Sequence, residues 1–151
     1  MNMKDTSGIE PEQTITRSAH MSNVPQLITF VCCYAREKGF PENTINEIEV
    51  SLKEAISYII VYAHQENPGE IQISVTIDIR GRLAIVVTDT GKSCNLLLGN
   101  NPFFESDTSL YKEKTRVISI LRKVFGDIEF KRNEGKNVHS FYISKNDNSI
   151  V

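Results

Sequence analysis

Two carboxylates stand out because of their surroundings. Glu54 projects from a predicted helix face on which Val50 and Val61 are apolar, where a surface helix would normally carry solvated charges. Asp89 lies in the stretch VTDTGKS, which follows an apolar run. That stretch is either the mouth of a nucleotide pocket or the polar end of a strand, because Asp and Gly also dominate ordinary turns. Taken alone, Glu54 is an ordinary helix-surface carboxylate. Only a position in register with Asp89 would indicate a role in catalysis or binding.

Two helices are predicted in the first half of the chain. Residues 22–40 carry apolar side chains at helical spacing, and Gly39 is placed to end the helix. Residues 41–65 form the strongest pattern, with Asn43 or Thr44 expected to cap the start. One face of this second helix is a continuous apolar stripe, which is enough to dock it on a sheet. The stripe consists of Ile45, Ile48, Leu52, Ala55, Ile56, Ile59 and Ala63.

Strands and a third helix complete the predicted domain. Alternating or continuous apolar runs predict strands at 14–19, 70–79 and 83–89, and a hairpin at 127–144 whose turn spans 134–137. Residues 112–125 have helical periodicity. The region between Cys94 and about Lys112 has little periodicity, and a loop of that length in a compact domain is expected to be a lid or a binding loop.

This order of elements predicts an α+β fold. Hairpin-connected strands and helices that are amphipathic on one side indicate a two-layer α/β sandwich, with a mixed, mostly antiparallel sheet covered on one face by about three helices. We expect a single domain at 13–145, a flexible leader at 1–12 and a flexible tail at 146–151.

Composition excludes several classes of function. The formal charge is −2 and the Lys and Arg residues are scattered, so a direct nucleic-acid partner is not expected. No apolar run is long enough to cross a bilayer and no signal peptide is visible, which favours the cytoplasm and no membrane contact. The three cysteines indicate buried thiols rather than disulfides or a zinc site, and no metal ligands are predicted. His20, His64 and His139 share no spacing with carboxylates or cysteines and are treated as ordinary residues.

The element order carries a resemblance to a known family. Together with EVSLKEAISYIIVYAH on the second helix and VVTDTG at the end of a central strand, it resembles the GHKL (Bergerat-fold) ATPases, which have the histidine-kinase-like ATPase fold. Within them the chain is most similar to the bacterial anti-sigma-factor branch, small serine protein kinases of partner-switching systems. The resemblance spans roughly residues 14–144, and FGDIEFKRNEGKNVHSFYI is similar to the closing segment of those proteins.

The resemblance implies roles for individual residues. In the family's helix motif a general-base Glu is followed four residues later by an Asn that binds magnesium, and these positions hold Glu54 and Tyr58. A phenol is a poor ligand for this hard cation. In the family's Asp-x-Gly-x-Gly motif the Asp accepts a hydrogen bond from the adenine amino group; Asp89 and Gly91 match. Ser93 replaces the second glycine, which weakens the close approach of the backbone to the base.

The phosphate side of the motif set is also altered. The family carries a glycine-rich lid at the start of the third helix, whereas residues 113–119 here read EKTRVIS and contain no glycine. Lys114 and Arg116 remain as side-chain cations that could attract phosphate. The cofactor that the resemblance implies is therefore ATP with magnesium. Both features that would hold its phosphates, the magnesium ligand and the glycine-rich lid, are altered in this sequence.

Three functions follow from the resemblance. The first is an anti-sigma-factor-like regulator of a partner-switching system, related to ATP-dependent serine protein kinases but with an impaired nucleotide site. The second is an active ATP-dependent serine/threonine protein kinase that phosphorylates an anti-sigma-factor antagonist. The third is an ATPase module of another GHKL branch. For the first two, the implied partners are a sigma factor or an antagonist protein, and the implied assembly is a homodimer.

Overall fold

The structure is a computed structural model that describes residues 11–64, 68–97 and 108–145, with side chains left undescribed at 108–111. The predicted tail and all but two residues of the predicted leader lie outside these ranges, as does most of the predicted lid. The domain boundaries at 13 and 145 therefore stay predictions.

A five-stranded sheet forms one layer of the domain. Its strand order is β1-β2-β3-β5-β4, and every neighbouring pair is antiparallel. β3, the most apolar strand, takes the central position that its sequence predicts. The strands are β1 (Gln13–Ser18), β2 (Glu70–Ile77), β3 (Leu83–Asp89), β4 (Asp127–Asn133) and β5 (Lys136–Ile143).

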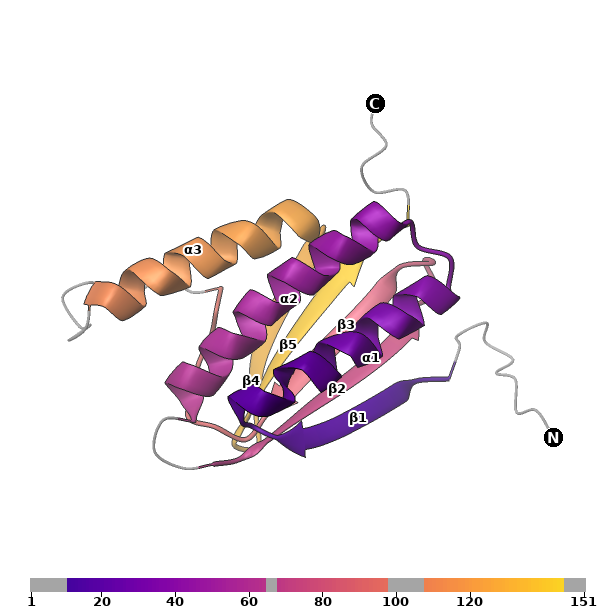
Figure 1. The fold of residues 1–151 in the computed structure, drawn as a ribbon. Coiled ribbons are helices and arrows are strands. Elements are labelled where there is room, and N and C mark those ends of the chain that lie inside the picture. The colour runs from indigo at the N-terminus through magenta and orange to yellow at the C-terminus, as the bar shows by residue number, and fades with distance from the viewer. Residues whose placement is uncertain (1–10, 65–67, 98–107, 146–151) are drawn as a thin grey trace.

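Three helices form the second layer and lie on one face of this sheet (Figure 1). They are α1 (Val24–Glu37), which follows a short 3-10 turn η1 (Met21–Asn23), α2 (Glu42–Ala63) and α3 (Thr108–Val124). α2 lies between the other two and contacts both. The predicted α+β class, with a sheet covered on one face by about three helices, is confirmed. Within the described residues no helix is both long enough and apolar enough to cross a membrane.

The core fills the space between the two layers. Alternate residues of the central strands point toward the helices and are almost completely buried, as are the predicted stripe of α2 and the inner faces of α1 and α3. Burial of each such side chain stabilises the fold by roughly 1.5–3 kcal/mol relative to its exposure to water. Among the largest are Leu27, Ile48, Leu52, Ile59, Ile73, Ile85 and Phe141.

Two helix starts differ from the prediction. α2 begins at Glu42 after an extended Pro41, and neither Asn43 nor Thr44 is its N-cap. Pro41 sets the entry because its ring fixes φ near the observed −65°. α3 begins at Thr108, four residues before the predicted start, and the intervening residues belong to the helix rather than to a lid. The start was missed because residues 108–111, TSLY, show little helical periodicity of their own.

The turn between β4 and β5 is shorter than predicted. It consists of Glu134 and Gly135, with φ of 52° and 78°, so the predicted span of 134–137 is wrong. Two consecutive residues with positive φ make the tight hairpin turn whose twist matches that of the flanking strands. The shorter turn brings Asn137 into β5, where it becomes part of the site described below.

The cysteines are not all buried, contrary to the prediction. Cys32 and Cys94 are buried, whereas the adjacent Cys33 is exposed on α1. Burial raises the pKa of Cys32 to about 11 and that of Cys94 to about 12. Because the thiolate is the reactive form, both buried thiols should be inert at neutral pH.

We therefore expect one thiol of three to react rapidly with an aromatic disulfide reagent at pH 8 in the native protein. Cys33→Ser should remove this rapid phase and leave the slow reaction of the other two, which follows unfolding. Absorbance of the released thiolate counts the reacting groups. Rapid release of two or more equivalents from the native wild type would contradict the burial of Cys32 and Cys94.

Candidate functional site

Asp89 is the last residue of β3 and is completely buried on the helix-facing side of the sheet. Its Oδ1 lies 3.0 Å from Nε2 of His64, 3.0 Å from Nδ2 of Asn137 and 2.9 Å from the backbone nitrogen of Gly91. Because an ionised carboxylate only accepts, all three groups donate to it. Its Oδ2 is buried and has no hydrogen-bond partner in the described part of the chain. Oδ1 thus fixes the position of the carboxylate, and Oδ2 is an acceptor that no described residue uses.

His64 is the C-cap of α2, directly after Ala63, and its ring fits between two glycines. A Cβ atom placed on Gly69 or on Gly91 would lie 2.8 Å from the imidazole ring. At Gly91 the same atom would also lie 2.5 Å from the backbone oxygen of Ala63. Gly91 is therefore required by the close approach of the strand end to the end of α2, a reason independent of any nucleotide.

The register of β3 and β5 places Asn137 opposite Asp89. The Asn137 amide donates to the backbone oxygen of Lys92 at 2.8 Å, and its Oδ1 accepts from the backbone nitrogen of Cys94 at 3.0 Å. His139 lies two residues after Asn137 on the same face of β5. Its Nε2 accepts a hydrogen bond from the backbone nitrogen of Leu96 at 3.1 Å. These two side chains thus hold the segment that follows β3 against the sheet.

His139 must be neutral to make this contact. Burial, with a smaller contribution from Lys114, lowers its pKa to about 4. Its ring packs on Phe130 and Phe141, with centroids 4.8 Å and 6.3 Å away. The imidazole therefore acts as an acceptor in an apolar setting throughout the physiological pH range.

Glu54 lies on the side of α2 that faces α3. Its Oε1 is 2.5 Å from Nη2 of Arg116, and the same guanidinium nitrogen is 2.5 Å from Oε2 of Glu113. The hydrogen bonds that Arg116 donates to Glu113 and to Glu54 raise the pKa of Arg116, with Glu113 the larger cause. With Glu54 one third exposed and Arg116 half exposed, solvent screens this pair, and its effect on stability is at most about 1 kcal/mol. The ion pair joins α2 to α3. It also engages the Glu54 carboxylate, which the family resemblance implies is a general base.

Tyr58 lies one helical turn beyond Glu54 and is buried. Its ring stacks on that of Tyr62, with centroids 5.7 Å apart and an angle of 19° between the planes. The ammonium group of Lys92 lies 4.6 Å from the centroid of Tyr62. Aromatic rings and a cation thus line α2 between the level of Glu54 and the level of Asp89.

The predicted site residues fall into two groups. Glu54 forms an ion pair with Arg116, and Asp89 accepts a hydrogen bond from the backbone of Gly91. The two carboxylates therefore belong to different polar clusters. His64 is ten residues beyond Glu54 on α2, so the clusters are about 15 Å apart along the helix.

Lys114 and Ser93 lie near the Asp89 cluster. The charge of Lys114 opposes the rise that burial causes in the pKa of Cys94, and it adds to the fall that burial causes in the pKa of His139. Lys114 therefore lies near the segment after β3. Ser93 is exposed.

Three polar residues of the site were missed from the sequence. His64, Asn137 and His139 carry the hydrogen bonds around Asp89, yet the histidines were treated as ordinary and Asn137 was placed in a turn. A signal existed in β5, where Asn137 and His139 occupy the same inward-facing side of the strand as Phe141 and Ile143. Polar residues on a core-facing stripe indicate buried hydrogen-bond partners.

An antiparallel sheet under three helices, with an acid on the central helix and Asp-x-Gly at the end of the central strand, defines the class of GHKL-type ATPase folds. Residues 18–142 match the family described as histidine kinase-like ATPase domain, and the chain belongs to that family. No curated protein matches it in sequence.

Solved structures share this fold. The chain is similar to the blue-light activated histidine kinase of Erythrobacter litoralis EL346, with a TM-score of 0.56 and 12% identity over 85% of this chain and 43% of that one. It is also similar to a histidine kinase domain from the same protein, with a TM-score of 0.51 and 12% identity over 82% of this chain and 59% of that one. The chain thus spans about half the length of these structures, and the similarity concerns the fold.

The residues present are suited to the adenine of a magnesium nucleotide but not to its magnesium ion. The unpartnered Oδ2 of Asp89 is an acceptor suited to an amino group such as that of adenine. Magnesium, in contrast, prefers carboxylate, amide and phosphate oxygens, and the family's amide position holds the buried, stacked phenol of Tyr58. Within the described residues no three His, Cys, Asp or Glu side chains gather as a metal site.

We predict that Gly91→Ala destabilises the protein by about 2 kcal/mol, because the added methyl group overlaps backbone and ring atoms of α2. Ser93→Ala, at the exposed position two residues on, should change the free energy of unfolding by less than about 0.5 kcal/mol. Urea denaturation of the three proteins measures both. Equal stability of Gly91→Ala and wild type would refute the close packing of the strand end on α2.

A second prediction concerns His139. Its folded pKa of about 4 lies below the ordinary value of 6.5, so between these values the unfolded chain binds a proton that the folded chain does not. The free energy of unfolding should therefore fall as pH drops, by about 2 kcal/mol between pH 7 and pH 5 from this residue. His139→Gln keeps an acceptor for the Leu96 nitrogen but does not titrate.

Urea denaturation of wild type and His139→Gln at both pH values isolates this contribution, because the other titrating groups are common to the two proteins. The loss on acidification should be smaller in the variant by that amount. An identical loss in both proteins would show that His139 is not held neutral.

Proposed function

We propose that this domain is an anti-sigma-factor-like regulator of a bacterial partner-switching system, and that it acts by binding proteins with a nucleotide site that no longer supports magnesium-ATP chemistry. Its partners are a sigma factor or an anti-sigma-factor antagonist, it works in the cytoplasm, and it forms a homodimer. Nucleic acid is not contacted directly.

The observation that carries this proposal is the buried stack of Tyr58 on Tyr62. Phosphoryl transfer depends mainly on positioning and charge stabilisation, to which the metal is central. A phenol in place of the metal-binding amide removes a ligand, and its ring also takes up space on the face of α2 that the family turns toward the nucleotide. Replacement of a ligand by a well-packed aromatic ring is a change that favours fold stability over catalysis.

The contact between Glu54 and Arg116 supports the same conclusion. A general base must be able to reach the proton that it removes, and here the carboxylate is engaged by a guanidinium group that also binds Glu113. Arg116, one of the two cations predicted to attract phosphate, is thereby partly neutralised. Neither residue is available for its predicted role while this pair is closed.

A second candidate, the active serine/threonine kinase, is favoured by one observation. Oδ2 of Asp89 is a buried acceptor without a partner among the described residues, as an adenine contact would require. In this alternative, ATP with magnesium is bound, the pair between Glu54 and Arg116 opens, and Glu54 accepts the proton of a serine hydroxyl on the antagonist.

Calorimetry with magnesium-ATP separates the two candidates. For the proposed regulator we expect a dissociation constant weaker than about 1 mM and no dependence on magnesium. Affinity purification of the tagged chain from its host should recover a sigma factor or an antagonist protein without added nucleotide. Tight, magnesium-dependent binding, with labelling of the antagonist that Glu54→Gln abolishes, would instead establish the kinase. Recovery of neither partner class would refute the regulatory role.

A further inference from the structure

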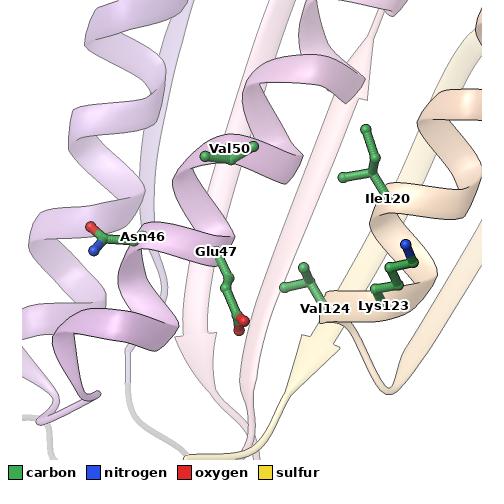
Figure 2. Close-up of a pocket in the computed structure, with 6 residues that line it drawn as sticks. All are labelled: Asn46, Glu47, Val50, Ile120, Lys123 and Val124. Atoms are coloured by element: carbon green, nitrogen blue, oxygen red, sulfur yellow. The ribbon is translucent and has the colours of Figure 1, made fainter.

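Two hollows open on the helical layer, one on each side of α2. The α2–α3 hollow has a volume of about 380 Å³, and Figure 2 shows its lining residues on the two helices, with apolar and polar side chains mixed on both walls. The α1–α2 hollow has a volume of about 280 Å³ and two walls of different character. Its α1 wall, which includes η1, consists of Met21, Val24, Pro25, Ile28 and Thr29, and its α2 wall of Glu49, Lys53 and Ser57.

The α1 wall of the α1–α2 hollow is mainly apolar. Val24 and Ile28 are buried, whereas Met21 is 47% exposed. An unbranched methionine side chain adapts its shape to the group that it contacts. This wall can therefore cover an apolar group that enters the hollow.

The α2 wall is a row of polar side chains. Glu49, Lys53 and Ser57 follow one another at intervals of four residues, so they lie on one face of α2 about 6 Å apart. Glu49 and Lys53 are exposed, and neither forms an ion pair or a hydrogen bond with another residue that the structure describes. A Glu and a Lys at this spacing can pair with each other on a helix surface. Here they stay apart, and each can contact a group of opposite charge.

The size of the α1–α2 hollow limits what can occupy it. Pockets for drug-sized ligands and cofactors have volumes of about 300–1,000 Å³, and this hollow lies just below that range. It is large enough for one bulky apolar side chain. Protein interfaces are commonly anchored in this way, by a side chain that fills a pocket while the surrounding contacts exclude water.

We propose that the α1–α2 hollow receives a helix of a partner protein, which packs an apolar side chain against Met21 and places a basic residue opposite Glu49 and an acidic residue opposite Lys53. Residues i and i+4 of a helix have the same spacing as Glu49 and Lys53, and residue i+3 lies on the same face. A helix that binds in a groove uses residues at these positions as its anchors. The partner helix thus carries the pattern basic-x-x-apolar-acidic, and the two charges exchange places if it runs in the opposite direction.

This inference rests on the proposed regulatory role, since the occupant is a protein, and it deepens that role by assigning a docking surface. The α1–α2 hollow contains none of Glu54, Tyr58 and Asp89. Its test needs only the purified chain and synthetic peptides. A failed peptide titration would overturn this surface and leave the regulatory role standing if a sigma factor or an antagonist is recovered from the host.

Two peptides of about 18 residues, long enough to be helical, test the charge pattern. One contains Lys-x-x-Leu-Glu in an alanine-rich background, and the other has Lys in place of that Glu. In NMR titrations of the labelled full chain, the first should bind with a dissociation constant below about 1 mM and shift the backbone amide signals of Met21, Glu49 and Lys53 most. It should bind about fivefold more tightly than the second, which brings a Lys to Lys53.

Lys53→Glu should reverse this preference, because it gives the α2 wall two carboxylates. Lys123→Glu is the matched control, since Lys123 is also exposed, lies in the α2–α3 hollow and yields a variant of the same net charge. The control should keep the preference of the wild type. A preference that reverses in both variants would show that net charge alone decides binding, and it would overturn the proposal.

Met21→Asp tests the apolar wall, and Val61→Asp is its control because Val61 is 52% exposed and lines neither hollow. Met21→Asp should weaken binding of the first peptide about tenfold with an unchanged melting temperature, and Val61→Asp should bind like wild type. Replacement of the peptide's Leu by Ala should cause the same loss without any change to the protein. Absence of binding to the wild type at 1 mM, or signal shifts centred on the α2–α3 hollow, would overturn the proposal, and the latter would assign the partner helix to that hollow.

Discussion

The buried carboxylate of Asp89 is the interaction on which the arrangement of the site depends. A charge removed from water is costly unless donors surround it, and here the donors come from the end of α2, from β5 and from the turn after β3. Loss of any one donor would leave part of that cost uncompensated. The three elements are therefore held together by a polar contact at the edge of an otherwise apolar core.

This constraint explains several local choices in the sequence. His64 needs room for its ring, and Gly69 and Gly91 supply it. Asn137 is long enough to reach Asp89 and two backbone groups of the following segment, which fixes the path of the chain as it leaves the sheet. His139 continues this arrangement to Leu96 and stays neutral because it is buried. The segment after β3 is thus positioned by side chains of β5 rather than by a strand of its own.

The fold could be predicted because each of its long elements carries a clear periodic pattern. The apolar stripe of α2 and the alternation of β2 and β3 specify which faces pack together. The start of α3 could not be found in this way, since residues 108–111 show little helical periodicity of their own. The cap of α2 could not be found either, because Pro41 sets the entry by its fixed φ. The exposure of Cys33 depends on which side of α1 packs on the sheet: Cys32 lies at the edge of the buried face and Cys33 lies outside it.

The site was harder to predict because its contacts join residues far apart in the chain. Glu54 and Asp89 were recognised from local motifs, but the partners that determine their chemistry, Arg116 and His64, belong to other elements. A motif gives the type of a residue, whereas its reactivity depends on what surrounds it. Here the surroundings differ for the two acids. Oδ2 of Asp89 has no hydrogen-bond partner among the described residues and lies in a buried cluster, whereas Glu54 lies in a solvated ion pair one turn from the stacked Tyr58. The chain keeps the fold of its family, with Asp89 in a buried hydrogen-bonded cluster and Glu54 in an ion pair with Arg116. The regulatory role proposed above requires that fold, because partner proteins would recognise its surface, and it does not require Glu54 to be released from Arg116.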